Sequence, residues 1–129
     1  MSSDIRLAIV GSVRFVEPLA LYWADSIIDE TICRLDPAVV ISGGADGIDT
    51  RVREVAEQLG YTPENGRLIE HLPAHLRWEP DGYKARNLQI VADCTDLLCI
   101  RCHVSTTYGS GWTADQADRL GKTVRRVLL

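Results

Sequence analysis

The chain contains no long apolar run, no excess of positive charge and no repeat or low-complexity segment. No apolar stretch approaches the ~20 residues of a membrane-spanning helix, so we expect no membrane contact. A net charge of −4 over 129 residues argues against stable binding to long nucleic acid, which depends on neutralising phosphates. The first residues lack a basic segment followed by an apolar stretch, so no secretion signal is visible and we predict a cytoplasmic protein.

Cysteine and histidine are too few and too scattered to predict a metal site. Cys99-Ile100-Arg101-Cys102-His103 matches the C-x-x-C-H pattern of haem attachment. The match lies at the end of a predicted buried strand, where alternate residues point to opposite faces, and haem attachment requires export. We therefore interpret Cys99 and Cys102 as packing residues and expect neither a metal nor a cofactor.

Apolar runs alternate with helical patterns along a chain of one-domain size, 1–129. This alternation predicts a three-layer Rossmann-like α/β fold, with a five-stranded parallel sheet in the order 3-2-1-4-5 and helices on both faces. In the third helix we expect Leu88, Val91 and Ala92 to face inward. The predicted strands cover 5–10, 38–41, 67–72, 96–102 and 123–128, and the helices cover 18–35, 48–59, 84–94 and 112–120.

Three segments follow neighbouring strands and should meet at the carboxyl edge of the sheet, where ligands of such folds bind. They are 11–15, 42–49 and 103–111. In the second of them, Ser42-Gly43-Gly44-Ala45-Asp46-Gly47 joins a buried strand to an amphipathic helix. Its glycines tolerate positive φ, and the helix N-terminus offers free N–H groups, so the turn predicts a phosphate site. Ser42 would add a hydroxyl, and Asp49 would accept a ribose hydroxyl. The alternative is a tight turn with Asp49 as a plain N-cap.

A second glycine-rich loop, Ser105-Thr106-Thr107-Tyr108-Gly109-Ser110-Gly111, precedes the helix that we expect from Trp112. It is dense in hydroxyl and N–H groups, so Thr107, Gly109, Ser110 and Gly111 could hold a second phosphate or the ribose. The alternative is a solvated loop with Ser110 as N-cap.

Other polar and aromatic residues have ambiguous roles from the residues alone. Arg86 could pair with a phosphate and Asn87 could recognise a base or a sugar, although an arginine at a helix start is commonly a surface residue. Trp78 would stack on a base or cover the core. Arg14, just after the first strand, is equally open.

The ordered motifs together resemble the SLOG superfamily, which includes the LOG phosphoribohydrolases and the DNA-processing protein DprA. The resemblance is closest to the YspA/YpsA-related branch, which has a W…G…A…RN block. The resemblance implies a nucleotide-like ligand and a role for Arg86 in phosphate contact or catalysis. The matching residues are Ala8-Ile9-Val10-Gly11-Ser12 with Arg14, Ser42 to Asp49, Trp78, Gly82, Ala85, Arg86-Asn87, Ala92-Asp93, Gly109-Ser110, Ala117, Gly121-Lys122 and Val124.

The resemblance leaves the activity open, because the LOG motif P-G-G-x-G-T-x-x-E ends in a glutamate that serves glycosidic cleavage. Thr113 stands at that position here, and a threonine cannot act as a carboxylate. Cleavage would need a substitute such as Asp115, Asp49 or Asp46. We therefore favour a ligand-binding or sensor domain for a nucleotide-derived small molecule. The alternatives are a nucleotide N-glycosidase and, third, single-stranded nucleic-acid binding. Family analogy also predicts a homodimer or higher homo-oligomer.

Overall fold

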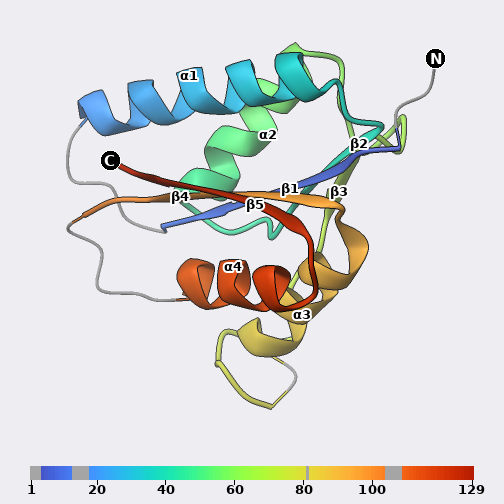
Figure 1. Ribbon diagram of the computed structural model, residues 1–129, viewed down its shortest axis with the longest axis vertical. Helices are drawn as coiled ribbons and strands as arrows, with labels where there is room; N and C mark the ends of the chain where they lie inside the picture. Colours follow the sequence, from blue (N-terminus) through green and yellow to red (C-terminus); the bar gives the residue numbers. More distant parts are fainter. Residues whose placement is uncertain (1–3, 13–17, 81, 104–108) are drawn as a thin grey trace.

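A five-stranded parallel sheet forms the centre of the structure, a computed structural model that describes residues 4–12, 18–80, 82–103 and 109–129. The strands lie in the order β3-β2-β1-β4-β5 (Figure 1), which confirms the predicted topology. Because all neighbours are parallel, the carboxyl ends of the strands meet at one edge. The strands are β1 (Arg6–Gly11), β2 (Val39–Ser42), β3 (Leu68–Glu70), β4 (Asp96–Arg101) and β5 (Thr123–Leu128).

Two pairs of helices cover the sheet, α1 (Pro18–Leu35) and α2 (Ile48–Gln58) on one face and α3 (Tyr83–Asp93) and α4 (Gly109–Arg119) on the other (Figure 1). Alternate residues of each strand face opposite layers. Leu7 and Ile9 of β1 pack in the core beneath α1 and α2, whereas Ala8 and Val10 pack in the core against α3 and α4. The predicted three-layer architecture is confirmed.

Helix α4 begins at Gly109, so the prediction that Gly109, Ser110 and Gly111 belong to a loop is wrong. Glycine and serine are poor helix formers in isolation, which is why their pattern indicates a loop. In the folded chain the hydroxyl of Thr113 donates to the carbonyl of Gly109, 2.7 Å away. Packing against the sheet outweighs the weak propensity and extends the helix by one turn.

Helix α3 buries a different face from the one that its apolar residues predict. Leu88 is 43% exposed and Ala92 is exposed, which corrects the expectation that both point inward; Val91 is buried as predicted. The buried face carries Ile90 and Val91 together with Arg86 and Asn87 at the start of the helix. Two polar side chains thus occupy positions that a simple core-packing helix would fill with apolar ones.

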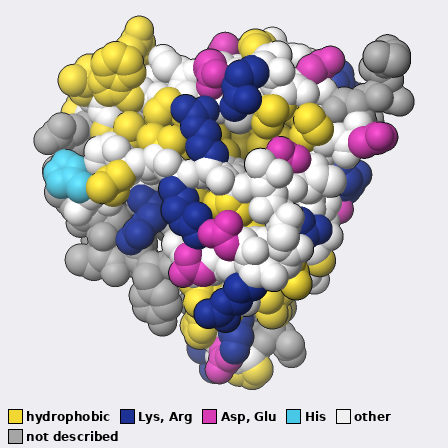
Figure 2. All heavy atoms as spheres, in the orientation of Figure 1, with side chains coloured by type: hydrophobic (Ala, Val, Ile, Leu, Met, Phe, Trp, Pro, Cys, Tyr) yellow, Lys and Arg dark blue, Asp and Glu magenta, His cyan; other side chains and the backbone are white. Residues whose placement is uncertain are grey.

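The surface carries exposed apolar side chains on the amino-terminal half of α1, where Leu19, Tyr22 and Trp23 are more than half exposed. Figure 2 shows hydrophobic side chains gathered over this end of the helix. None of the described helices is long and apolar enough to cross a bilayer. The homo-oligomer stays a prediction.

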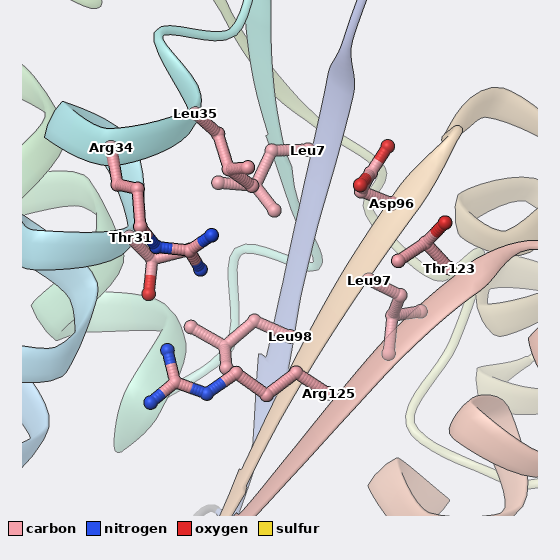
Figure 3. A pocket seen from close by; sticks show the side chains of 9 residues that line it. All are labelled: Leu7, Thr31, Arg34, Leu35, Asp96, Leu97, Leu98, Thr123 and Arg125. Carbon is pink, nitrogen blue, oxygen red and sulfur yellow. The ribbon is translucent and has the colours of Figure 1, made fainter.

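A small cavity lies at the opposite edge of the sheet from the glycine-rich segments. Its volume is about 80 Å³, and its lining includes Asp96 and Thr123, the first residues of β4 and β5, together with Leu7 and Thr31. Arg34 and Arg125 flank it (Figure 3). The cavity is therefore separate from the carboxyl edge at which the sequence motifs converge.

Candidate functional site

Gly11 and Ser12 fasten the carboxyl ends of β1 and β4 to the start of α2. A Cβ atom at Gly11 would lie 2.4 Å from both the Ile100 carbonyl oxygen and Cγ1 of Ile48, so only glycine fits. Ser12 is 1% exposed. Its carbonyl accepts from the N–H of Ile48 at 3.1 Å, and its hydroxyl accepts from the N–H of Cys102 at 3.0 Å. The structure therefore places Ser12 in a positioning role.

The Ser42–Gly47 turn uses part of its hydrogen-bonding capacity internally. The N–H of Gly44 donates to the Ser42 hydroxyl at 3.3 Å, and the N–H of Ala45 donates to Oδ2 of Asp49 at 3.0 Å. Within the described residues, the N–H groups of Asp46 and Gly47 make no hydrogen bond. Gly44 and Gly47 have φ of 69° and 73°, the left-handed region that glycine tolerates. The free donors of the turn thus lie in its second half.

Asp49 caps the turn and not the helix. The N-cap position of α2 is Gly47, with no side-chain cap, so the plain N-cap interpretation of Asp49 is wrong. The side chain is 8% exposed overall. Burial raises the pKa of Asp49, and the Ala45 N–H, the charge of Arg86 and the hydroxyl of Ser42 act in the opposite direction. A carboxyl group with a perturbed pKa beside a cation is characteristic of functional sites.

Arg86 extends from the buried face of α3 to the underside of the turn and is 7% exposed. Its Nη1 donates to the carbonyl of Gly43 at 2.5 Å, and its Nε donates to Oδ1 of Asn87 at 2.7 Å. Burial lowers the pKa of Arg86, and the charge of Asp49 opposes that shift. Among the described residues, Nη2 of Arg86 has no hydrogen-bond partner and is not fully buried. Part of this guanidinium is therefore open to a ligand.

Gly43 allows the buried cation and the buried carboxyl to approach the backbone from below. A Cβ atom at this position would lie 2.4 Å from Nη1 of Arg86 and 2.9 Å from Oδ2 of Asp49. The two side chains flank Gly43, and each charge favours the ionised form of the other. The site therefore places one buried cation and one buried carboxyl group beside the same stretch of backbone.

Asn87 and Trp78 bring the start of α4 to the same site. A Cβ atom at Gly109 would lie 3.8 Å from Nδ2 of Asn87 and 3.8 Å from the Trp78 ring. The Trp78 ring packs edge-on against Trp112, with centroids 5.0 Å apart. The structure therefore brings the Trp78 segment, α3 and the start of α4 together, and Gly109 contributes helical backbone and not a loop.

Arg101 is a site residue that sequence reasoning missed. It ends β4, and its Nη1 lies 3.3 Å from the position of a Cβ atom on Gly111, in the first turn of α4. Of the buried side-chain N and O atoms in the described residues, Nε of Arg101 alone lacks a hydrogen-bond partner. An arginine directly after the apolar run 97–100 at the carboxyl end of β4 is the signal that could have identified it.

Glu70 and His71, at the end of β3, were also missed. Oε2 of Glu70 lies 3.5 Å from the position of a Cβ atom on Gly44 and accepts from Arg53 of α2 at 2.7 Å. The N–H of His71 donates to the Ser42 carbonyl at 2.8 Å, and its ring contacts Asp93 at 2.9 Å. Glu70 ends, and His71 follows, a short strand whose pattern is weak, and charged residues at strand ends are too common to single out.

Several predicted residues lie elsewhere or outside the described part. Asp115 is exposed and accepts from Arg126 of β5 at 2.8 Å, and Asp46 is also exposed. Thr113 is fully buried, so its side chain faces the core. Arg14 and Thr107 fall outside the described residues. Of the three candidate carboxylates, only Asp49 lies beside Arg86.

Comparison with known proteins identifies the fold. No family model matches the sequence, and no curated protein matches it. Solved structures do match, among them the protein TM1055, with a TM-score of 0.68 and 19% identity over 96% of this chain and 72% of that chain. DNA processing protein A from Streptococcus pneumoniae has a TM-score of 0.68 and 21% identity. That match covers 95% of this chain but 50% of the longer protein.

The molybdenum cofactor carrier protein from Chlamydomonas reinhardtii also has a similar structure. Its TM-score is 0.67 and its identity is 15%, over 98% of this chain and 76% of that chain. The chain therefore has a Rossmann-like α/β fold, and at these identities the likeness establishes the fold alone. The placement in the SLOG superfamily, and within it in the YspA/YpsA-related branch, stays a prediction.

Proposed function

We propose that the protein binds a nucleotide or a nucleotide-derived small molecule and holds its phosphate at the Ser42–Gly47 turn as a ligand-binding or sensor domain. The observation that supports this most strongly is the burial of Arg86 beneath Gly43. Burying a cation is costly unless it is paired. Arg86 has carbonyl and amide partners but no direct carboxylate. A bound phosphate would supply the missing negative charge.

The backbone near the turn supports an anionic ligand as well. The free N–H groups of Asp46 and Gly47 adjoin the N-terminus of α2, whose aligned peptide dipoles favour negative charge. The N–H of Ala45 already donates to Asp49, so the N–H groups available to a ligand are those of the second half of the turn. We infer that the phosphate lies over the second half, with Nη2 of Arg86 at its side.

A second contact region lies at the start of α4. Asn87 is 6% exposed and adjoins Gly109, and Arg101 lies under Gly111 with an unpartnered Nε. The helix N-terminus and the arginine both favour an anion. This region would take a second phosphate or another polar group of the ligand, and Trp78 and Trp112 would offer aromatic surface for a base.

A nucleotide N-glycosidase is the alternative, and Asp49 is the residue that favours it. The raised pKa of Asp49, caused by burial, is a property of catalytic acids. Against it, Oδ2 already accepts from Ala45, and the exposed Asp115 is held by Arg126. The hydrogen bonds of Asp49 and Asp115 therefore favour ligand binding without cleavage.

Nucleotide binding is compatible with what the neighbours' names state. One neighbour carries a molybdenum cofactor and another processes DNA. A role as a carrier or sensor of a small molecule agrees with the name of the molybdenum cofactor carrier protein. Binding to single-stranded nucleic acid agrees less well with this chain, because its net charge is −4 and such binding relies on a positively charged groove.

The test is calorimetric titration with a panel of nucleoside mono- and diphosphates, combined with chromatography for released base. We expect binding without release in the wild type and a loss of about tenfold or more in the affinity of Arg86→Gln, since a charge-assisted hydrogen bond is removed. Arg119→Gln, on the exposed end of α4, is the matched control. No binding of any phosphorylated ligand by the wild type would refute the proposal, and release of base would favour the glycosidase.

A further inference from the structure

Glu70 places a carboxylate beside the proposed phosphate turn, where a negative charge is unexpected. Its Oε2 lies 3.5 Å, and its Cβ 3.7 Å, from the position that a Cβ atom on Gly44 would occupy. A carboxylate so close to an anion site repels the anion. Such a residue weakens phosphate binding unless it contributes a contact to some other part of the ligand.

The carboxylate of Glu70 is held in one orientation and keeps one oxygen available. Nε and Nη2 of Arg53 both donate to Oε2, at 3.1 and 2.7 Å. Within the described residues Oε1 accepts no hydrogen bond and is not fully buried. An ionised carboxylate is an acceptor only, so Oε1 is suited to hydroxyl or amino donors of a ligand.

Leu72 provides an apolar surface next to this acceptor. Its side chain is 67% exposed, and its Cδ2 lies 2.6 Å from the position of a Cβ atom on Gly44. A sugar ring offers hydroxyl groups along its edge and C–H groups on its face. The pair of Glu70 and Leu72 matches both, and the absence of a side chain on Gly44 lets Leu72 pack against the backbone of the turn.

We propose that Glu70 and Leu72 form a sugar subsite on the β3 side of Gly44, in which Oε1 of Glu70 accepts the vicinal hydroxyls of a ribose phosphate. This inference rests on the proposed function, because the phosphate of the same ligand lies over the turn. It also moves the ribose contact away from Asp49, whose buried Oδ2 is already bonded to Ala45. In Rossmann folds an acidic side chain commonly binds ribose hydroxyls in this manner. The chemical class of the ligand is therefore a ribosyl phosphate, with its hydroxyls unmodified.

The experiment compares ribose 5-phosphate, its 2-deoxy and 3-deoxy analogues, and inorganic phosphate by calorimetry. We expect the wild type to bind ribose 5-phosphate about tenfold more tightly than either deoxy analogue, the discrimination that a hydrogen bond to a charged group provides. Glu70→Gln should erase this preference. The same variant should bind inorganic phosphate as tightly as the wild type or more tightly, because a repulsive charge is removed.

The matched control is Glu54→Gln. Glu54 is likewise paired with an arginine of α2, Arg51, at 2.8 Å, so it tests the loss of an Arg–Glu pair elsewhere on the same helix. It should keep the wild-type preference for ribose. Leu72→Ala should lower the affinity for ribose 5-phosphate by a few-fold and leave that for inorganic phosphate unchanged, since only apolar contact is lost.

Two results would overturn the subsite. One is equal binding of ribose 5-phosphate and its deoxy analogues by the wild type, and the other is an unchanged ribose preference in Glu70→Gln. Either result leaves the proposed function intact provided that inorganic phosphate still binds and loses affinity in Arg86→Gln. Absence of binding by inorganic phosphate and by every sugar phosphate overturns both proposals together.

Discussion

The two glycine-rich segments of the chain look alike in sequence but are built differently. Ser42–Gly47 is a true turn, with left-handed glycines at Gly44 and Gly47 and buried polar side chains beneath Gly43. The segment from Gly109 to Gly111 is the first turn of α4, and neither of its glycines has a positive φ. In the first segment glycine is needed because of positive φ angles and close side-chain contacts. In the second segment the backbone is helical and the contacts are looser, so another small residue should fit.

The largest difference between the two segments should appear in the free energy of unfolding when one glycine of each is replaced by alanine. Gly43→Ala places a Cβ 2.4 Å from Nη1 of Arg86, so the buried arginine must move. We expect a loss of about 2–3 kcal/mol in the free energy of unfolding, typical of overpacking, and loss of nucleotide binding. Gly111→Ala meets only the end of the Arg101 side chain, at 3.3 Å, and should be neutral or stabilising by about 0.5–1 kcal/mol. Denaturant unfolding checks both, and equal costs would remove the distinction between the segments.

Gly44→Val tests the conformational half of the comparison. A β-branched residue at a φ of 69° is strained by about 1–2 kcal/mol, and its side chain would displace Leu72, whose Cδ2 lies 2.6 Å from the Cβ position. We expect the variant to fold with a lower melting temperature and to bind no phosphorylated ligand in calorimetry. Wild-type affinity in a folded Gly44→Val would show that the ligand does not bind at this turn.

The carboxyl groups of the two regions should differ in their effect on anion binding. Burial raises the pKa of Asp49 above its ordinary value, so the group is neutral at low pH and becomes a repulsive charge as the pH rises through the raised pKa. Sulfate, which stays ionised throughout, should therefore bind more weakly as the pH rises, by on the order of tenfold. Asp49→Asn should weaken this dependence, since only the repulsion from Glu70 is left, and Asp115→Asn should leave it intact. A pH-independent sulfate affinity in the wild type would contradict the assignment.

The smallest effect on stability is expected from Asp93, which contacts the ring of His71 next to the Ser42–Gly47 turn. Desolvation would raise the pKa of Asp93, but hydrogen bonds from His71 and Arg6 outweigh it and hold this pKa below 3.8. The ionised form is favoured in the folded state, so the stabilisation is present above pH 3.8 and is lost as the pH falls through the lowered pKa. Asp93→Asn should cost about 1 kcal/mol at neutral pH, with the difference vanishing in acid. Thermal unfolding across pH measures it; a difference that persists in acid would point to another cause.

The strand order and the layers could be predicted because each strand and helix has a strong local pattern. Val39–Ser42 and Asp96–Arg101 are nearly continuous apolar runs, and such runs indicate buried parallel strands. The helix was predicted from Trp112, and its true start at Gly109 was missed because tertiary packing overrides the weak propensity of glycine. The short β3 has a weaker pattern, so Glu70 and His71 at its end could not be singled out.

Part of the site could be predicted because glycine clusters and arginines at strand–helix junctions are visible in the sequence. The hydrogen bonds within the site could not be predicted from the sequence. That Asp49 binds the N–H of Ala45, and that Ser12 binds Cys102, depends on how the elements pack. Arg101 and Glu70 acquire their significance only from atoms brought near them by the fold, the first turn of α4 and the backbone of Gly44.

The central claim, that a phosphate binds over the second half of the Ser42–Gly47 turn, can be tested by following backbone amide resonances during titration with adenosine monophosphate and inorganic phosphate. The account predicts saturable shifts of the Asp46 and Gly47 amides with both ligands, and a much smaller shift of Ala45, whose N–H is bonded to Asp49. Saturable binding that leaves the Asp46 and Gly47 amides unshifted would contradict it.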